Sequence, residues 1–281
     1  MIKSKKNKPV VIVFDLDETL GYFTQLGCFC DVIEKHNKKL LDKQEFFDIL
    51  DLNQEYLRPK IMDLLSLIID MKNKKMVNSI MIYTNNQGPV RWSDSIADYF
   101  SYKLNEKVFD KIIHAFKING QIIEPERTSH EKIYSDLLNC TKIPKDTIIY
   151  FIDDVNHPKM INDNVYYVNV KPYHYYLPMN TLLSRYANYK QLSKEESQNI
   201  WSRINQSIPK HFIYPKVKSE EEHNVDILTG KLLITQMNDF FSNITKTIYK
   251  KPLSLKITPS NISLKKYLNK SKNYKTFKNH K

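Results

Sequence analysis

The sequence predicts an α/β fold in which helices flank a parallel β-sheet. Short apolar runs rich in β-branched residues recur along the first two thirds of the chain, and Val10-Val11-Ile12-Val13-Phe14 is the clearest of them. An unbroken run of this kind is typical of a strand buried on both faces of a parallel sheet. Amphipathic stretches separate the runs, and such alternation predicts parallel strands joined by right-handed crossovers.

Each expected element follows from its local pattern. We expect strands where apolar runs end in polar residues, and helices where apolar residues share one helical face, as Ile133, Leu137 and Leu138 do. The expected elements are a strand over 9–16, a helix near 59–74, a strand over 79–84, a helix near 91–103, a helix over 131–140, and strands over 147–152 and 165–170.

The 281 residues, 41% of them hydrophobic, suffice for one α/β domain with an appendage. Residues 21–57 are too few for a large cap and predict a small flap made of a hairpin and a helix near 43–50. The segment after the domain predicts two or three helices, including 199–208 and 229–249, and the sequence leaves open whether they pack on the sheet or bind a partner. The expected divisions are a basic tail over 1–8, the α/β domain over 9–180, a helical extension over 181–249 and a disordered tail over 250–281.

Positive charge is concentrated at the two ends of the chain. The formal net charge is +12, yet residues 250–281 contain ten Lys and no acid, and residues 1–8 contain four Lys and no acid. A Lys-rich segment with little apolar content is typical of a disordered tail. Such a tail could contact nucleic acid or an acidic partner, or it could serve only to solubilise the protein.

Acidic, hydroxyl and amide side chains follow three of the predicted strands. They are Asp15 and Asp17, then Thr84 and Asn85, then Asp153 and Asp154. Ligands of open parallel sheets bind at the carboxyl ends of the strands, so these residues predict one shared site. Each acid taken singly could instead cap the helix after its strand. The occurrence of all these residues in this order along the chain favours one shared site over separate helix caps.

The motif Asp15-Leu16-Asp17-Glu18-Thr19-Leu20, the strand-end Thr84 and the intervening Lys132 together resemble the haloacid dehalogenase (HAD) superfamily of phosphotransferases. Within that superfamily the chain is most similar to the carboxy-terminal-domain phosphatases and NLI-interacting-factor-like phosphatases, whose first motif reads Asp-x-Asp-Glu-Thr-Leu. Arg58-Pro59 adds to the likeness. The resemblance covers residues 9 to about 175 and implies a HAD-like Rossmannoid sheet.

The resemblance also implies a Mg²⁺-dependent phosphatase. Asp15 would be the nucleophile that forms an aspartyl-phosphate, and it would bind Mg²⁺ as well. Asp17 would act as general acid and then base, and its backbone carbonyl would reach the same metal. Asp153 and Asp154 would complete the metal shell. Close relatives usually carry Asn in place of Asp154, which leaves the division of ligation between Asp153 and Asp154 open.

Phosphate binding is implied for three further residues. The Thr84 hydroxyl and the Asn85 backbone N–H would hold the non-bridging oxygens, and Lys132 would add a compact positive charge. From the residues alone, Lys142 and Lys145 are alternatives to Lys132.

The small flap predicts an open pocket, which suits a phosphorylated Ser or Thr of a protein substrate better than a small metabolite. A second hypothesis keeps the mechanism but takes nucleotides or nucleic-acid ends as substrates. A third is a non-catalytic binding scaffold with the same fold, although such relatives typically lack the motif carboxylates.

The sequence also bears on the compartment. Three cysteines, an odd count, and the lack of a signal-peptide pattern favour an intracellular, cytoplasmic or nuclear protein. No apolar run approaches the roughly eighteen residues of a membrane span, so we expect no membrane partner. The sequence does not indicate an oligomeric state.

Overall fold

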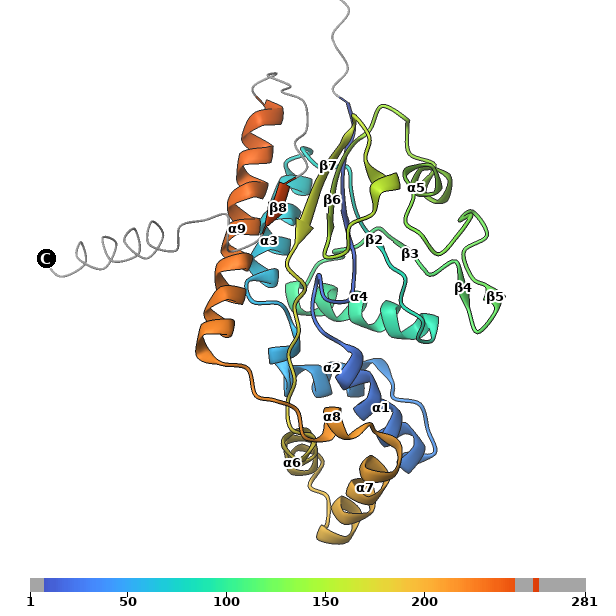
Figure 1. Ribbon diagram of the computed structural model, residues 1–281, viewed down its shortest axis with the longest axis vertical. Coiled ribbons are helices and arrows are strands. Elements are labelled where there is room, and N and C mark those ends of the chain that lie inside the picture. Colours follow the sequence, from blue (N-terminus) through green and yellow to red (C-terminus); the bar gives the residue numbers. More distant parts are fainter. Residues whose placement is uncertain (1–7, 246–254, 258–281) are drawn as a thin grey trace, which may run out of the picture.

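The computed structural model describes residues 8–245 and 255–257. Its centre is a six-stranded parallel sheet in the order β3-β2-β1-β6-β7-β8. The strands are β1 (Val10–Phe14), β2 (Ser79–Tyr83), β3 (Lys111–Ile113), β6 (Ile148–Asp153), β7 (Val165–Val170) and β8 (Leu255–Ile257) (Figure 1). Numbered within this sheet, the order is 3-2-1-4-5-6, as in Rossmann-type sheets. The predicted α/β class is confirmed.

The central position of β1 explains its unbroken apolar run. β1 pairs with β2 on one side and with β6 on the other, and its five side chains are at most 5% exposed. Ile12 and Phe14 belong to one hydrophobic core, whereas Val11 and Val13 belong to a second core on the opposite face. Both faces need apolar residues because successive side chains of a strand point to opposite sides.

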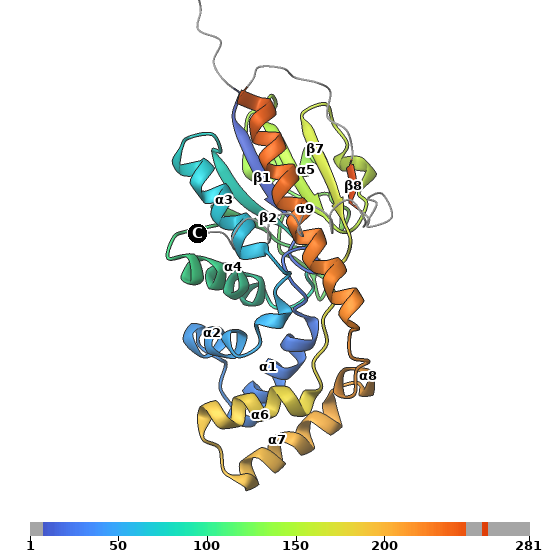
Figure 2. The same cartoon turned by 90° about the vertical axis from the view of Figure 1, so that its left-hand side faces the viewer.

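Helices cover both faces of the sheet. α3 (Ile61–Asn73), α4 (Val90–Leu104) and α9 (Glu220–Thr245) contribute to the core that contains Ile12, and α5 (Tyr134–Thr141) contributes to the core that contains Val11 (Figures 1 and 2). The helices predicted near 59–74 and 91–103 are confirmed as α3 and α4. The helix predicted over 131–140 begins only at Tyr134, so that Lys132 lies in the preceding loop.

A second group of helices lies beyond the carboxyl ends of the strands (Figures 1 and 2). The hairpin predicted within 21–57 is wrong, because this segment forms α1 (Thr24–Asn37), α2 (Lys43–Asp51) and a 3₁₀ turn. α1 is helical because Leu26, Phe29 and Ile33 recur at helical spacing and are completely buried. The helix predicted near 43–50 is confirmed as α2.

Four helices lie in the described part of the C-terminal extension, more than the two or three expected. α6 (Met179–Lys190), α7 (Lys194–Ser207) and the short α8 (Lys210–Ile213) pack on one another, and α7 also packs on α1. A capping box made by Ser193 and Glu196 starts α7 ahead of the predicted position.

The long helix α9 packs along α3 and over the sheet. Its Phe240 ring meets the rings of Tyr150 and Tyr166 at centroid distances of 4.7 and 4.9 Å. Gly230 permits a close approach to α3, because a Cβ atom there would lie 2.1 Å from the Pro59 carbonyl oxygen. The sequence left open whether the extension packs on the sheet or binds a partner. Its helix α9 packs on the sheet.

Three pieces of β-structure were not predicted. β3 is only three residues long, and β4 (Lys117–Ile118) with β5 (Gln121–Ile122) forms a small hairpin. β8 falls within the tail predicted to be disordered, so that prediction is wrong for residues 255–257, whose backbone pairs with the otherwise open edge of β7. The remaining predictions for the 1–8 and 250–281 tails concern residues 1–7, 250–254 and 258–281, which lie outside the described residues. The end of the helix predicted over 229–249 also lies outside them, because residues 246–249 are not described.

Among the described helices, none combines the length and the hydropathy that a membrane span requires.

Candidate active site

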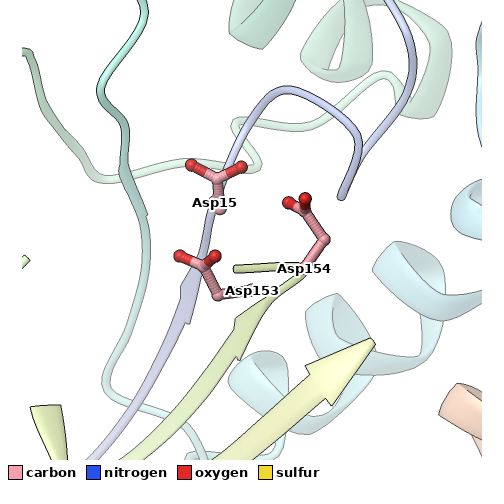
Figure 3. A group of neighbouring side chains, drawn as sticks. All are labelled: Asp15, Asp153 and Asp154. Atoms are coloured by element: carbon pink, nitrogen blue, oxygen red, sulfur yellow. The ribbon is translucent and has the colours of Figure 1, made fainter. Parts of the chain in front are cut away.

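The candidate site lies where the strand order reverses, between β1 and β6. Asp15 directly follows β1, and Asp153 is the last residue of β6 with Asp154 next to it. The Asp15 backbone N–H donates to the Ile152 carbonyl at 2.8 Å, which holds the two strand ends side by side. Figure 3 shows the three carboxyl groups gathered at these ends, and one oxygen from each lies within 4.8 Å of the others. Crevices at such reversal points are the usual ligand sites of open α/β sheets.

Lys132 lies between two of these carboxylates. Its Nζ donates to Asp15 Oδ1 and, at 2.6 Å, to Asp153 Oδ2, and its side chain is 2% exposed. Lys142, one of the two alternatives, pairs instead with Glu126 at the surface. Lys145 is not among the residues that line the site. The ammonium group that meets the strand-end acids is therefore that of Lys132.

Asp17 faces a different partner from Asp15. Its Oδ2 accepts a hydrogen bond of 2.7 Å from Asn86 Nδ2, and it is not a member of the cluster formed by Asp15, Asp153 and Asp154. The following residue, Glu18, has a φ of 60°, in the left-handed region, which turns the chain sharply after Asp17. Asp17 thus lines the same pocket as the acid cluster but is hydrogen-bonded to Asn86.

A buried arginine braces this turn. Arg58 Nε donates to the Thr19 carbonyl at 2.6 Å, and its Nη2 donates to the Lys171 carbonyl at 2.9 Å. The Thr19 hydroxyl in turn donates to Asp154 Oδ1 at 3.0 Å. Arg58, which the sequence analysis used only as part of the family resemblance, thus connects the turn after β1 with the segment after β7.

The segment after β2 forms the opposite wall of the site. The Thr84 N–H donates to the Ile113 carbonyl at 2.9 Å, and the Thr84 Oγ1 accepts from the Asn86 N–H at 3.0 Å. The seven residues predicted from sequence all line one pocket of about 280 Å³. Its complete lining is Asp15, Asp17, Glu18, Thr84, Asn85, Asn86, Lys132, Asp153, Asp154, Val155 and His157.

Burial and mutual repulsion dominate the electrostatics of the pocket. Burial raises the pKa of Asp15 well above its ordinary value, and the nearby charge of Lys132 only partly opposes this. Burial and the charge of Asp153 raise the pKa of Asp154 to about 6. Asp153 is the exception, because the charge of Lys132 and a hydrogen bond from His157 outweigh burial and lower its pKa. The protein alone thus leaves the cluster short of positive charge.

The donor set suits a hard divalent cation. Asp15, Asp153 and Asp154 supply carboxylate oxygens, the ligand type that Mg²⁺ prefers, whereas Lys132 is the cation hydrogen-bonded to this cluster. Three carboxylates around one ammonium group leave negative charge that a bound divalent ion would neutralise. Which oxygens of Asp153 and Asp154 would bind the ion stays open.

Sequence reasoning missed two contributors to the site. Asn86, which binds Asp17, follows the predicted Thr84-Asn85 pair and could have been found as a third polar residue after the strand. Arg127, which donates to the Thr84 carbonyl at 2.9 Å, lies in an irregular loop and carries no local signal. His157 also lines the pocket, with its Nε2 3.5 Å from Asp153 Oδ2.

No family model, curated protein or solved structure matches this chain. The function is therefore inferred from the geometry of the candidate site and from the motif resemblance.

Proposed function

We propose that this protein is a Mg²⁺-dependent phosphatase of the HAD type, which hydrolyses phosphomonoesters through an aspartyl-phosphate on Asp15. The observation that carries the proposal is the position of the Lys132 ammonium group between the Asp15 and Asp153 carboxylates, with Asp154 beside them. A nucleophile, a fixed positive charge and oxygen ligands for a cation are thereby combined in one pocket.

The first half-reaction transfers the phosphoryl group to the protein. One Asp15 oxygen attacks phosphorus, and a new P–O bond forms as the bond from phosphorus to the leaving oxygen breaks. Asp17 gives its proton to that oxygen, so the alcohol departs neutral. Burial raises the pKa of Asp17, although the Asn86 hydrogen bond opposes the shift, and this favours the protonated form that a general acid needs.

The second half-reaction returns the protein to its starting state. Asp17, now a carboxylate, removes a proton from a water molecule whose oxygen attacks phosphorus. The P–O bond to Asp15 breaks, inorganic phosphate is released, and Asp15 is again a carboxylate. The charge of Lys132 and the donors of the Thr84–Asn85 segment stabilise the phosphoryl oxygens in both steps. Magnesium, when bound by Asp15, Asp153 and Asp154, supplies the charge neutralisation that allows two anions to approach.

The size of the pocket favours a phosphorylated side chain as substrate. Its volume of about 280 Å³ lies just below the range of roughly 300–1,000 Å³ typical of pockets that enclose small molecules. Such a pocket accommodates a phosphoryl group with a short side chain and leaves the rest of the substrate outside. A phosphoserine or phosphothreonine of a protein fits this description, so we take protein Ser/Thr phosphatase activity as the leading function.

The proposal is tested by exchanging Asp15 for its uncharged isostere. We expect Asp15→Asn to reduce hydrolysis of an aryl phosphate by at least about 10⁴-fold, because a covalent step is lost. EDTA should abolish turnover of the natural chain, and added Mg²⁺ should restore it. The matched control is Asp63→Asn, which removes an exposed carboxylate paired with Lys60 and should leave the rate unchanged. Turnover that survives Asp15→Asn would exclude the proposal, and so would a natural chain inactive on every phosphate despite binding Mg²⁺, as expected of a scaffold.

A further inference from the structure

The loop between β5 and α5 buries an arginine that takes no part in the chemistry described above. Arg127 is 2% exposed, and its guanidinium lies over the Tyr83 ring at 4.7 Å from the ring centroid. Its Nη1 donates to the carbonyls of Thr84 and His114 at 2.9 and 2.7 Å. Its Nη2 donates to Asn85 Oδ1 at 2.6 Å and to the His130 carbonyl at 3.1 Å.

These acceptors are neutral oxygens and not carboxylates. Burying a guanidinium among neutral groups is unfavourable unless its N–H groups are bound, and burial does lower the pKa of Arg127. Even so, Arg127 Nε has no hydrogen-bond partner within the described part of the chain. The side chain is therefore held by the segments that it joins and not by an ion pair.

The contact with Asn85 determines the direction of its amide group. A guanidinium has only donors, so it must face the amide oxygen, and the Asn85 Nδ2 donors are left to point elsewhere. Within residues 8–245 and 255–257 no hydrogen bond engages this Nδ2, and Asn85 lines the site pocket. Arg127 thus leaves two side-chain N–H donors of Asn85 available to a ligand.

The contact with the Thr84 carbonyl has the same effect on the backbone. The Thr84 C=O and the Asn85 N–H belong to one planar trans peptide, in which these two groups point in opposite directions. Because the C=O faces Arg127, the Asn85 N–H faces away from it. This N–H is the group assigned above to the non-bridging oxygens of the phosphoryl group.

The same guanidinium also holds the segment that carries the site lysine. The His130 carbonyl that it binds lies two residues before Lys132, and the next residue, Ile133, donates its N–H to the Tyr83 hydroxyl at 3.3 Å. Arg127 and the Tyr83 ring beneath it therefore connect both segments on which phosphate binding depends.

We propose that Arg127 is the positioning residue of the phosphate site. By binding the Thr84 carbonyl, the Asn85 amide oxygen and the His130 carbonyl, it directs the Asn85 donors toward the phosphoryl group and keeps them in register with Lys132. This inference rests on the proposed function, because it takes the pocket to be a phosphate site.

The test measures binding of inorganic phosphate by calorimetry in the presence of Mg²⁺, together with kcat and KM for an aryl phosphate. Arg127→Lys keeps the charge but loses the two-pronged guanidinium. We expect phosphate affinity and kcat/KM to fall by about 10- to 100-fold, as misplacement of binding groups does. Affinity for Mg²⁺ alone should stay within about twofold, because Arg127 does not contact the acid cluster. Arg185→Lys is the control away from the pocket, and it should leave phosphate affinity unchanged. Arg185 also donates to a backbone carbonyl, that of Leu52, and is in addition paired with Glu55.

A double-mutant cycle identifies the route of the effect. Asn85→Ala should reproduce part of the loss of phosphate affinity. The double variant should bind phosphate no more than about threefold more weakly than the weaker-binding of the two single variants, because Arg127→Lys already misdirects the side-chain donors that Asn85→Ala removes. Losses that simply multiply would overturn the proposal, as would an Arg127→Lys protein with unchanged phosphate affinity. If Arg127→Lys does not fold, Asn85→Ala decides alone, and unchanged phosphate affinity in it would overturn the proposal.

The proposed function can fail separately from this inference. Suppose that the natural chain binds phosphate but has no turnover, and that Arg127→Lys abolishes this binding. That result would contradict the proposed phosphatase function while supporting the positioning role of Arg127. A natural chain that neither binds phosphate nor hydrolyses an ester would contradict both.

Discussion

The balance of individual charges in the pocket determines how the site behaves when no cation is bound. Asp15, Asp153 and Asp154 approach one another at the strand ends, and Lys132 is hydrogen-bonded to only two of them. The folded chain therefore holds carboxylates that repel one another and are largely cut off from water. Relieving one of these charges should stabilise the metal-free protein and weaken the binding of Mg²⁺, two opposite effects of a single substitution.

Asp154→Asn tests this balance. The pKa of Asp154 is about 6 in the folded chain, above the ordinary value near 4, so the unfolded chain releases this proton first as pH rises. Stability of the metal-free protein should therefore fall between about pH 4 and pH 6 and stay low above that range. Removing the charge should raise Tm at pH 7 by about 2–4 °C, which corresponds to roughly 1 kcal/mol after allowance for solvent screening.

The amide retains an oxygen that can accept the Thr19 hydroxyl, so the hydrogen bond need not be lost. The same variant should bind Mg²⁺ at least about tenfold more weakly, as titration calorimetry would measure. Asp63→Asn serves as the exposed control at both pH 5 and pH 7. A Tm that drops in Asp154→Asn at pH 7 without metal would refute the repulsion between the carboxylates.

At the scale of elements, the sequence usually predicted a strand or helix correctly where its buried face produced an apolar pattern over several residues. β1, β2 and β6 are largely apolar runs, and the polar residues at their carboxyl ends line the pocket, which is why six site residues could be named from the strands in advance. Lys132, the seventh, lies in a loop and was named from the motif resemblance. β3 could not be found, because three residues at the edge of a sheet carry too short a pattern. α1 was mistaken for a hairpin, although Leu26, Phe29 and Ile33 mark a helical face.

Contacts between distant segments were beyond local reasoning for a different reason. The role of Arg127 depends on carbonyl groups of Thr84 and His114, and a backbone carbonyl is present at every residue. The role of Arg58 likewise depends on the carbonyls of Thr19 and Lys171. Only the folded arrangement distinguishes these arginines from others in the chain.

The short strand β8 determines how the Lys-rich tail should be removed. β8 pairs with β7 through Val168, Asn169 and Val170, so a deletion that begins at residue 250 would alter the sheet as well as the charge. Deleting residues 258–281 removes seven of the ten Lys of the tail and retains the strand. For a protein Ser/Thr phosphatase, we expect this truncation to keep kcat/KM on a phosphopeptide within about twofold at any salt concentration.

The same truncation tests the nucleic-acid hypothesis. Lysine contacts with phosphates make binding strongly dependent on salt. A large, salt-dependent loss of activity on DNA or RNA ends in the truncated protein would therefore favour nucleic-acid ends as the substrate. A destabilised sheet, detected as a lower Tm, would indicate instead that the deletion disturbs β8.

At the scale of the whole molecule, two groups of helices surround one sheet. α3, α4, α5 and α9 cover its faces, whereas the helices of the 21–57 segment and α6, α7 and α8 lie beyond the strand ends (Figure 2). The candidate site opens at the strand ends, so the second group of helices is on the side from which a substrate would approach. Parts of the chain that are remote in sequence thus meet at one end of the sheet.

The central claim is that phosphorus becomes bonded to Asp15, and chemical trapping tests it most directly. Borohydride reduces an acyl-phosphate to an alcohol, so enzyme quenched during turnover with Mg²⁺ and then reduced should carry homoserine at position 15. Peptide mapping by mass spectrometry should find this change only when substrate and Mg²⁺ are both present, and never in Asp15→Asn. Steady turnover with no reduced residue at position 15, or with the change at another acid such as Asp17 or Asp153, would contradict the account.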